Sequence, residues 1–163
     1  MVTRVIGIDP GASGAVAVYE GGKVTSVVSM PVTKVKAGRV EVDAGKLYDV
    51  LDDFGDPSCV DLVVMEDVGA DPKFGASRAF SMGRNFGAAW AAVEIRGYPR
   101  VRVGPKVWKK ALLEGTDKSK EASIAFAQRL WPGLNLSPPG ARGPSHDWAE
   151  AALLAYYGVK HHV

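Results

Sequence analysis

The chain opens with a pattern of apolar and polar residues that is typical of strands. Residues 5–8 and 15–19 are two apolar runs, and residues 24–30 alternate between apolar and polar side chains. Short segments rich in glycine, serine and proline separate these runs, as they do in β-hairpins. The pattern therefore predicts three consecutive antiparallel strands at the start of the fold.

The rest of the chain alternates between helical and strand patterns. Apolar residues between 47 and 54 recur at helical spacing after Asp43, a typical N-cap residue, and residues 60–66 form an apolar run. The later pattern predicts helices at 77–96, from 105, at 118–131 and from 145 or 146 to 157, with a strand at 98–103. This order predicts one α/β domain over residues 1–163, in which an antiparallel meander is followed by alternating helices and parallel strands of a mixed sheet.

Composition narrows the class of protein. The 163 residues are 47% hydrophobic, which is enough for a core without disulfides. The formal charge is only +2, so any attraction to nucleic acid must come from local patches. The single cysteine, Cys59, excludes an internal disulfide framework and is expected in the core. Because no apolar run reaches the roughly 20 residues of a membrane span and the first nine residues lack signal-peptide features, we expect a cytoplasmic protein.

Four acidic residues stand at positions that favour a shared site. Asp9 and Glu66 each end an apolar strand, and Asp147 and Glu150 lie one helical turn apart on one face of the last helix. Crowded carboxylates raise one another's pKa unless cations hold them ionised. Oxygen ligands without a pair of thiolates favour magnesium or manganese over zinc. His146 adjoins the group and is either a functional residue or an ordinary helix cap or surface residue.

Basic residues occur in three regions. Lys106, Lys109, Lys110 and Lys120 come from two neighbouring predicted helices, where they form either a phosphate-binding rim or a solvated face. Lys73 and Phe74 lie in a glycine-rich segment after Glu66. Residues 31–39 carry Lys34, Lys36 and Arg39 without apolar periodicity, which predicts either a mobile basic loop or an ordinary solvated surface loop.

The long predicted helix carries a stripe of small residues. Ala79, Gly83, Gly87 and Ala91 recur every four residues, although each glycine costs a helix about 1 kcal/mol. A bare face of this kind lets another backbone approach closely. The stripe packs either against the sheet or against a symmetry mate in a dimer.

Three segments resemble, in order and spacing, the acidic motifs of the RuvC-type Holliday junction resolvases. They are residues 6–11 (IGIDPG), 64–66 (VME) and 147–153 (DWAEAAL). Residues 117–120 (DKSK) also resemble the family segment that bears an active-site lysine, here Lys118. Compact relatives of this kind occur in phages and prophages. Two departures are Glu150, where the bacterial enzymes usually have aspartate, and Trp148, which replaces a small residue.

The resemblance implies an RNase H-like fold and a homodimer that nicks two strands of a four-way DNA junction symmetrically, leaving 5′ phosphates and 3′ hydroxyls. It implies two magnesium ions, with manganese as a substitute, bound by Asp9, Glu66, Asp147 and Glu150, and Asp9 bridging them. Lys118 would offset charge on the phosphate, and Phe74 would stack on bases at the junction.

Other functions remain open from the residues alone. A related RNase H-like enzyme could act on flaps, forks or RNA–DNA hybrids with the same acids. The sugar kinase and actin superfamily also joins an aspartate to a glycine-rich hairpin, but its members need a second domain to close over the nucleotide. A third alternative is a DNA-structure-binding protein without catalytic activity, which the presence of all four acids disfavours.

Overall fold

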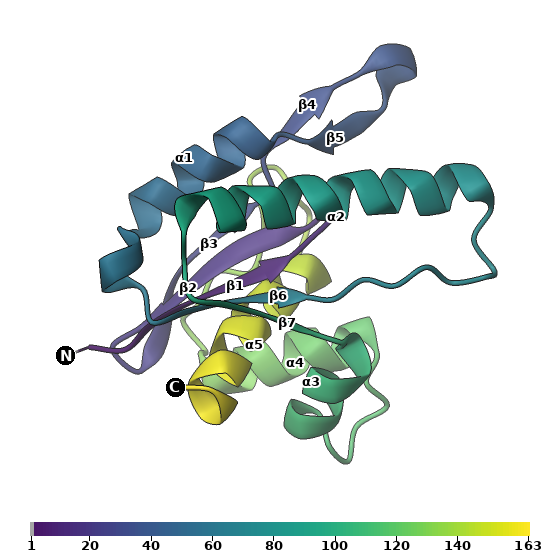
Figure 1. The fold of residues 1–163 in the computed structure, drawn as a ribbon. Coiled ribbons are helices and arrows are strands. Elements are labelled where there is room, and N and C mark those ends of the chain that lie inside the picture. Colours follow the sequence, from purple (N-terminus) through teal and green to yellow (C-terminus); the bar gives the residue numbers. More distant parts are fainter. Residues whose placement is uncertain (1) are drawn as a thin grey trace.

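The structure, a computed structural model that describes residues 2–163, is built around one five-stranded mixed sheet (Figure 1). The strands β1 (Arg4–Asp9), β2 (Ala15–Glu20) and β3 (Lys23–Ser29) form an antiparallel meander. Two later strands, β6 (Leu62–Glu66) and β7 (Arg100–Val103), run parallel to β1 and give the sheet order β3-β2-β1-β6-β7. The predicted mixed sheet is therefore confirmed.

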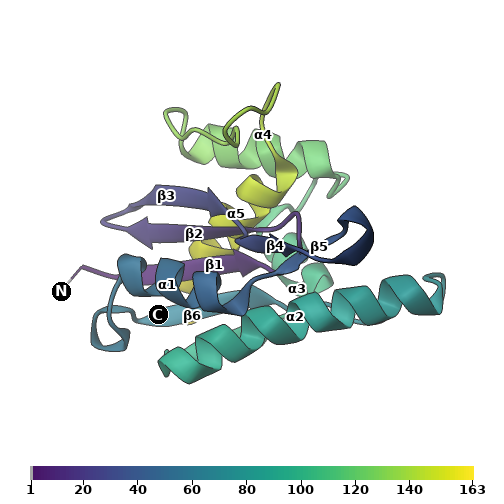
Figure 2. The same ribbon diagram turned by 90° about the horizontal axis from the view of Figure 1, so that it is seen from above.

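Helices cover both faces of this sheet (Figure 2). Helices α1 (Ala44–Phe54) and α2 (Ala76–Arg96) lie on one face. On the other face lies α5 (His146–His161), with α3 (Pro105–Leu112) and α4 (Lys120–Leu130) beside it. Successive residues of a strand point to opposite faces, so each face has its own core. Ile6 and Ile8 are buried under α1 and α2, whereas Val5 is buried on the side of α5.

The helix boundaries agree with the predicted caps. The backbone N–H of Lys46 donates to Asp43 Oδ1 at 3.1 Å, which confirms the N-cap of α1. The side chain of Ser145 caps α5, which continues to His161, beyond the predicted end at 157. The 3-10 turn η2 (Pro57–Cys59) lies between α1 and β6. Cys59 lies in that turn with its side chain exposed, so its predicted core position is wrong.

The basic segment that follows β3 forms a hairpin, so the prediction of a loop without strands over residues 31–39 is wrong. Strand β4 (Val32–Lys34) pairs antiparallel with β5 (Val40–Val42), and the 3-10 turn η1 (Lys36–Gly38) connects them. Of residues 31–42, only Val42 is buried. Each strand of this pair is only three residues long, which is too short for an alternating pattern to stand out in the sequence.

The small-residue stripe of α2 does not pack on the sheet. The helix turns Asn85, Ala89, Ala92 and Val93 inward. Gly83 and Gly87 are exposed, and a Cβ added to either would meet no atom within 4 Å. Packing of the stripe against the sheet is therefore wrong. Within residues 2–163, no helix is both long and apolar enough to cross a membrane.

Helix α5 lies directly on the backbone of β1 at Gly7. A Cβ built on Gly7 would stand 2.1 Å from the carbonyl oxygen of Ala151 and 2.4 Å from the backbone nitrogen of Ala155. Both contact atoms belong to the backbone, so neither can rotate away. Gly7 precedes Asp9 by two residues and Ala151 follows Glu150, so this contact brings the end of β1 to the start of α5.

We predict that Gly7→Ala destabilises the protein strongly. The added methyl group has no space against the α5 backbone, and overpacking of this kind costs about 1 to 3 kcal/mol or more. Urea denaturation monitored by circular dichroism measures the loss in the free energy of unfolding. Gly69→Ala is the matched control, because a Cβ at Gly69 meets nothing within 4 Å. Equal stability of the two variants would contradict the close packing.

Candidate active site

Asp9 and Glu66 are the last residues of two adjacent parallel strands. Ile8 of β1 pairs with Met65 of β6, so the two acids that follow leave the sheet at the same edge. The strand interiors are apolar and buried, which fixes this register because a shift by one residue would expose the core. The sheet thus brings two acids that are distant in sequence next to each other.

Helix α5, which packs on one face of the sheet, carries the other two predicted acids. Asp147 lies in its first turn, and Glu150 follows one turn later with only 7% of its surface exposed. Asp147 acts on Asp9 across the boundary between the sheet and the helix, because its side chain raises the pKa of the Asp9 carboxyl. The structure therefore brings all four predicted acids into one group.

Burial and mutual repulsion disfavour the ionised forms of these acids. Burial raises the pKa of Asp9 well above its usual range, and the negative charges of Glu66, Asp147 and Glu150 raise it further. Burial also raises the pKa of Glu66, with a smaller contribution in the same direction from Glu150. A hydrogen bond from Trp108 and the charge of Lys109 partly oppose this rise in the pKa of Glu66. Asp9 is the acid on which the other three charges act together.

Protein donors hold these carboxylates in place. The indole N–H of Trp108, a fully buried residue, donates to Glu66 Oε1 at 2.8 Å. Glu150 Oε1 accepts from Lys109 Nζ at 2.7 Å and from the Ser123 hydroxyl at 3.2 Å. His146 Nε2 lies 3.0 Å from Asp147 Oδ1, so His146 contacts the acidic group as well as starting α5.

The donor chemistry of the group fits a hard divalent cation, because it offers carboxylate oxygens at one end of the sheet. In the part of the chain that the structure describes, no three side chains of His, Cys, Asp or Glu are arranged so that they could already hold a metal ion. Glu66 and Glu150 point instead to Trp108 and Lys109. A cation would therefore require these side chains to exchange a protein donor for the metal.

An open cleft of about 490 Å³ leads to the two strand-end acids. Asp9 and Glu66 line it together with the turn at residues 10–14, and α2 contributes Arg78, Met82 and Asn85. The hairpin contributes Val40 to the same cleft. A larger hollow of about 710 Å³ lies between β3 and the loop after α4, but none of the four acids lines it.

Curated relatives give the acidic group a family context. The crossover junction endodeoxyribonuclease RuvC of Nitratidesulfovibrio vulgaris strain Hildenborough is 32% identical over 124 residues, which make up 75% of this chain and 73% of that protein. The protein of the same name from strain DP4 is 31% identical over the same shares. This chain belongs to the RuvC family of crossover junction endodeoxyribonucleases. No protein-family model matches the sequence.

Solved structures of the RuvC family show the same fold. Thermus thermophilus RuvC matches with a TM-score of 0.55 and 20% identity, covering 98% of this chain and 96% of the other. A structure of T. thermophilus RuvC in complex with Holliday junction substrate matches with a TM-score of 0.56 and 19% identity over the same shares. The expected RNase H-like fold is thereby confirmed.

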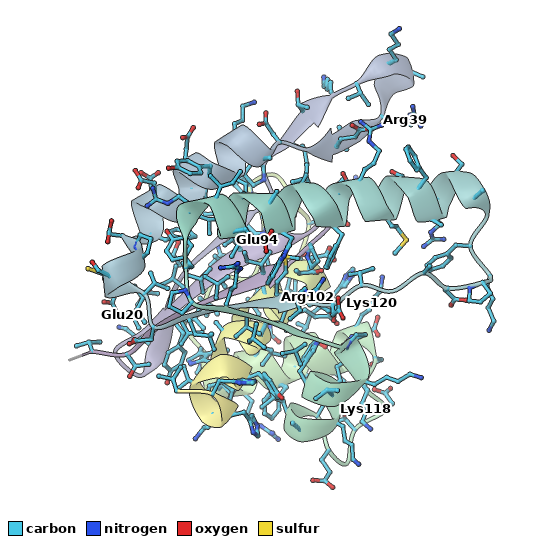
Figure 3. The ribbon with its side chains drawn as sticks, in the orientation of Figure 1. Glu20, Arg39, Glu94, Arg102, Lys118 and Lys120 are labelled. Atoms are coloured by element: carbon cyan, nitrogen blue, oxygen red, sulfur yellow. The ribbon has the colours of Figure 1, made fainter. Side chains whose placement is uncertain are left out.

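One of the predicted functional lysines contacts the acidic group, and the others are exposed on the surface. Lys109, predicted as part of a phosphate-binding rim, forms its ion pair with Glu150 instead. Lys118 is exposed in the loop before α4, where its backbone φ is 56° and its N–H donates to Thr116 Oγ1 at 3.1 Å. The side chains of Lys73, Lys106, Lys110 and Lys120 are exposed. Figure 3 shows Lys118 and Lys120 near α3 and α4, across α2 from Arg39 of the hairpin.

Phe74 lies beside the cleft, in the segment that joins β6 to α2. Its ring is half-buried, and the guanidinium carbon of Arg78 stands 4.2 Å from the ring centroid. Phe74 lines a small neighbouring hollow with Val68 and Met82, two residues that also line the cleft. The predicted aromatic therefore lies one side chain away from the space in front of the acids.

Sequence reasoning did not identify Trp108, Ser123 or the role of Lys109. Lys109 gave no distinguishing signal, because Lys106, Lys109 and Lys110 lie seven, four and three residues before Leu113 and so have equivalent helical spacing to it. Ser123 gave no signal, since a serine in a helix is ordinarily solvated. Trp108 matched the pattern of a core aromatic, and only the structure reveals that its N–H meets Glu66.

We predict that Trp108→Phe impairs DNA cleavage without unfolding the protein. The ring is kept, but Glu66 loses the donor that orients its carboxylate and lowers its pKa. Loss of such a supporting contact typically costs about 10- to 100-fold in activity or metal affinity. Single-turnover cleavage across pH measures this, and the acidic limb of the profile should move to higher pH. An unchanged profile would contradict an orienting role.

We predict that Asp9→Asn stabilises the metal-free protein at neutral and alkaline pH. Since the pKa of Asp9 is raised on folding, its ionisation destabilises the native state as pH rises through the folded pKa. At pH values below its ordinary pKa, the carboxyl is protonated in both states and the advantage of the variant disappears. Thermal melts in EDTA across pH measure the difference, and Mg²⁺ should then stabilise the wild type more than the variant. If the variant were less stable than the wild type at pH 8, ionisation of Asp9 would not be destabilising the native state.

Proposed function

We propose that this protein is a divalent-metal-dependent endonuclease that resolves Holliday junctions by paired symmetric nicks, leaving 5′ phosphates and 3′ hydroxyls. The observation that carries the proposal is the meeting of Asp9, Glu66, Asp147 and Glu150 at one edge of the sheet in a chain of the RuvC family. The open cleft before Asp9 and Glu66 supports access of a DNA strand. We place this activity in the cytoplasm of the cell and in a single nuclease domain.

The proposed chemistry assigns a role to each residue of the acidic group. Asp9, Glu66, Asp147 and Glu150 would hold two Mg²⁺ ions, for which Mn²⁺ can substitute, and these cations would offset the repulsion that the other three charges exert on Asp9. When bound, such ions activate a water molecule and stabilise the leaving 3′ oxygen. Trp108 orients Glu66, and Lys109 orients Glu150 and lowers the net charge of the group.

Two further residues act on the substrate in this proposal. Lys118 extends from the α3–α4 loop and offsets negative charge that builds on the phosphate during cleavage. Phe74 stacks on a base at the junction, an interaction worth about 1 to 3 kcal/mol per base. Lys73, Lys106, Lys110 and Lys120 contact DNA phosphates. Their exposure supports this assignment, since charged side chains must be accessible to reach a backbone.

Symmetric nicks require two active sites, and we propose that two copies meet through the exposed face of α2. Gly83 and Gly87 leave that face bare for the close approach of another backbone. Phe80 and Ile95 are large apolar side chains on the same helix and are 69% and 75% exposed. Burial of these side chains by a second copy would remove apolar surface from water.

The test compares cleavage of matched four-way junction, fork, linear duplex and RNA–DNA hybrid in Mg²⁺, Mn²⁺ or EDTA, with the nick positions mapped. We expect paired symmetric nicks confined to the junction and none in EDTA. Asp9→Asn should reduce cleavage by at least about a hundredfold, since a metal ligand supplies several kcal/mol to the transition state, and should still bind the junction. Asp53→Asn, which changes an exposed acid of α1, is the matched control.

Other outcomes would overturn the proposal in distinct ways. Equal cutting of forks would make the protein a broader debranching nuclease, and preference for the hybrid would make it a ribonuclease. Junction binding without cutting in either metal would leave only a DNA-structure-binding protein. Full activity of Asp9→Asn would remove the acidic group from the mechanism.

A further inference from the structure

We infer that the β4–β5 hairpin is a DNA-binding arm that holds the phosphate backbone of a junction arm beside the cut strand. The inference rests on the proposed function and adds to it a surface outside the acidic group. Three features carry it: the hairpin is fixed at its base, basic at its tip and placed at the rim of the active-site cleft.

The base of the hairpin is fixed to the body of the protein. The backbone N–H of Val42 donates to the buried Asn85 Oδ1 of α2 at 2.9 Å. Arg84 of α2 pairs with Glu41 at 2.7 Å. The backbone N–H of Asp43, the N-cap of α1, donates to the Pro31 carbonyl at 2.9 Å. The tip is therefore carried at a defined position and does not have to be ordered by its ligand.

The tip is basic and its positive charges are available. Lys34, Lys36 and Arg39 are all exposed, and within residues 2–163 none of the three forms an ion pair. The hairpin's one acid, Glu41, is neutralised by Arg84. No residue from 32 to 41 is buried, so these side chains contribute nothing to the core.

The hairpin lies at the rim of the cleft that leads to the acids. Val40, which pairs with Lys34 across the hairpin, lines that cleft together with Asp9 and Glu66. Arg78 of α2 lines it as well. Figure 2 shows the hairpin beside α2, toward the end of the sheet where β1 finishes. A DNA strand whose phosphate meets the acids would therefore pass close to the hairpin.

The chemistry of the tip fits a polyanion with regularly spaced charges. Lysine and arginine side chains on DNA phosphates release condensed counterions, and each such contact adds to the salt dependence of binding. The tip offers exposed cations, whereas the apolar Val35 is only partly exposed. A duplex arm of the junction satisfies this pattern, and such contacts position the DNA without reading its sequence.

The experiment replaces Lys34, Lys36 and Arg39 together with glutamine and measures junction affinity in EDTA between about 50 and 200 mM salt. We expect weaker binding and a slope of log K against log salt that is smaller by about 3, one for each lost phosphate contact. Cleavage at saturating junction should keep its rate, and the melting temperature should be unchanged because the tip supports no core.

The matched control replaces Lys23, Arg129 and Lys160 with glutamine, which removes the same charge. Lys23 is the first residue of β3, where it pairs with Glu20 of β2, and the other two lie in the last turns of α4 and α5. Equal affinity and slope for the two triple variants, while the wild type still cuts junctions, would overturn the hairpin inference alone. A wild type that neither binds nor cuts junctions would overturn the proposed function and the hairpin inference with it.

Discussion

The fold depends on the close contact between helix α5 and strand β1. Gly7 has no side chain, so the α5 backbone at Ala151 and Ala155 rests directly on the central strand. Gly158 repeats the arrangement near the other end of the helix, where a Cβ would stand 2.6 Å from Val64 Cγ2. Small residues along the buried side of α5 allow the helix to pack closely against the sheet. The same contact brings acids from the two ends of the sequence into one group.

The mutual repulsion within the acidic group lowers the stability of the fold. Four carboxylates at one edge repel each other, and burial of Asp9 and Glu66 makes their ionised forms more costly. The fold partly offsets this through donors on α3 and α4, which contact Glu66 and Glu150. An arrangement that disfavours its own charged form is typical of functional sites rather than of structural ones.

The sequence predicted the parts of the structure that depend on local pattern. The strands of the five-stranded sheet, the N-cap at Asp43 and the start of the last helix at 145 or 146 follow from apolar periodicity and from residue types at strand and helix ends, and the same pattern selected the four acids. The parts that depend on tertiary packing were missed. Lys106, Lys109 and Lys110 looked alike in sequence, and only the rotation of α3 places Lys109 against Glu150. The hairpin at 31–42 buries only Val42, so it left little apolar pattern in the sequence. In α2, burial of Asn85 and its inward neighbours turns the small-residue stripe away from the sheet.

The direct test of the account is a crystal structure with Mn²⁺, whose anomalous scattering locates the ions without reference to the protein atoms. We expect anomalous density in contact with Asp9 and with carboxylates of both the sheet and α5. We also expect Glu66 to turn from Trp108, or Glu150 from Lys109, to become a ligand. Density only elsewhere, or none at this edge of the sheet at saturating Mn²⁺, would contradict the claim that the four acids form one metal site.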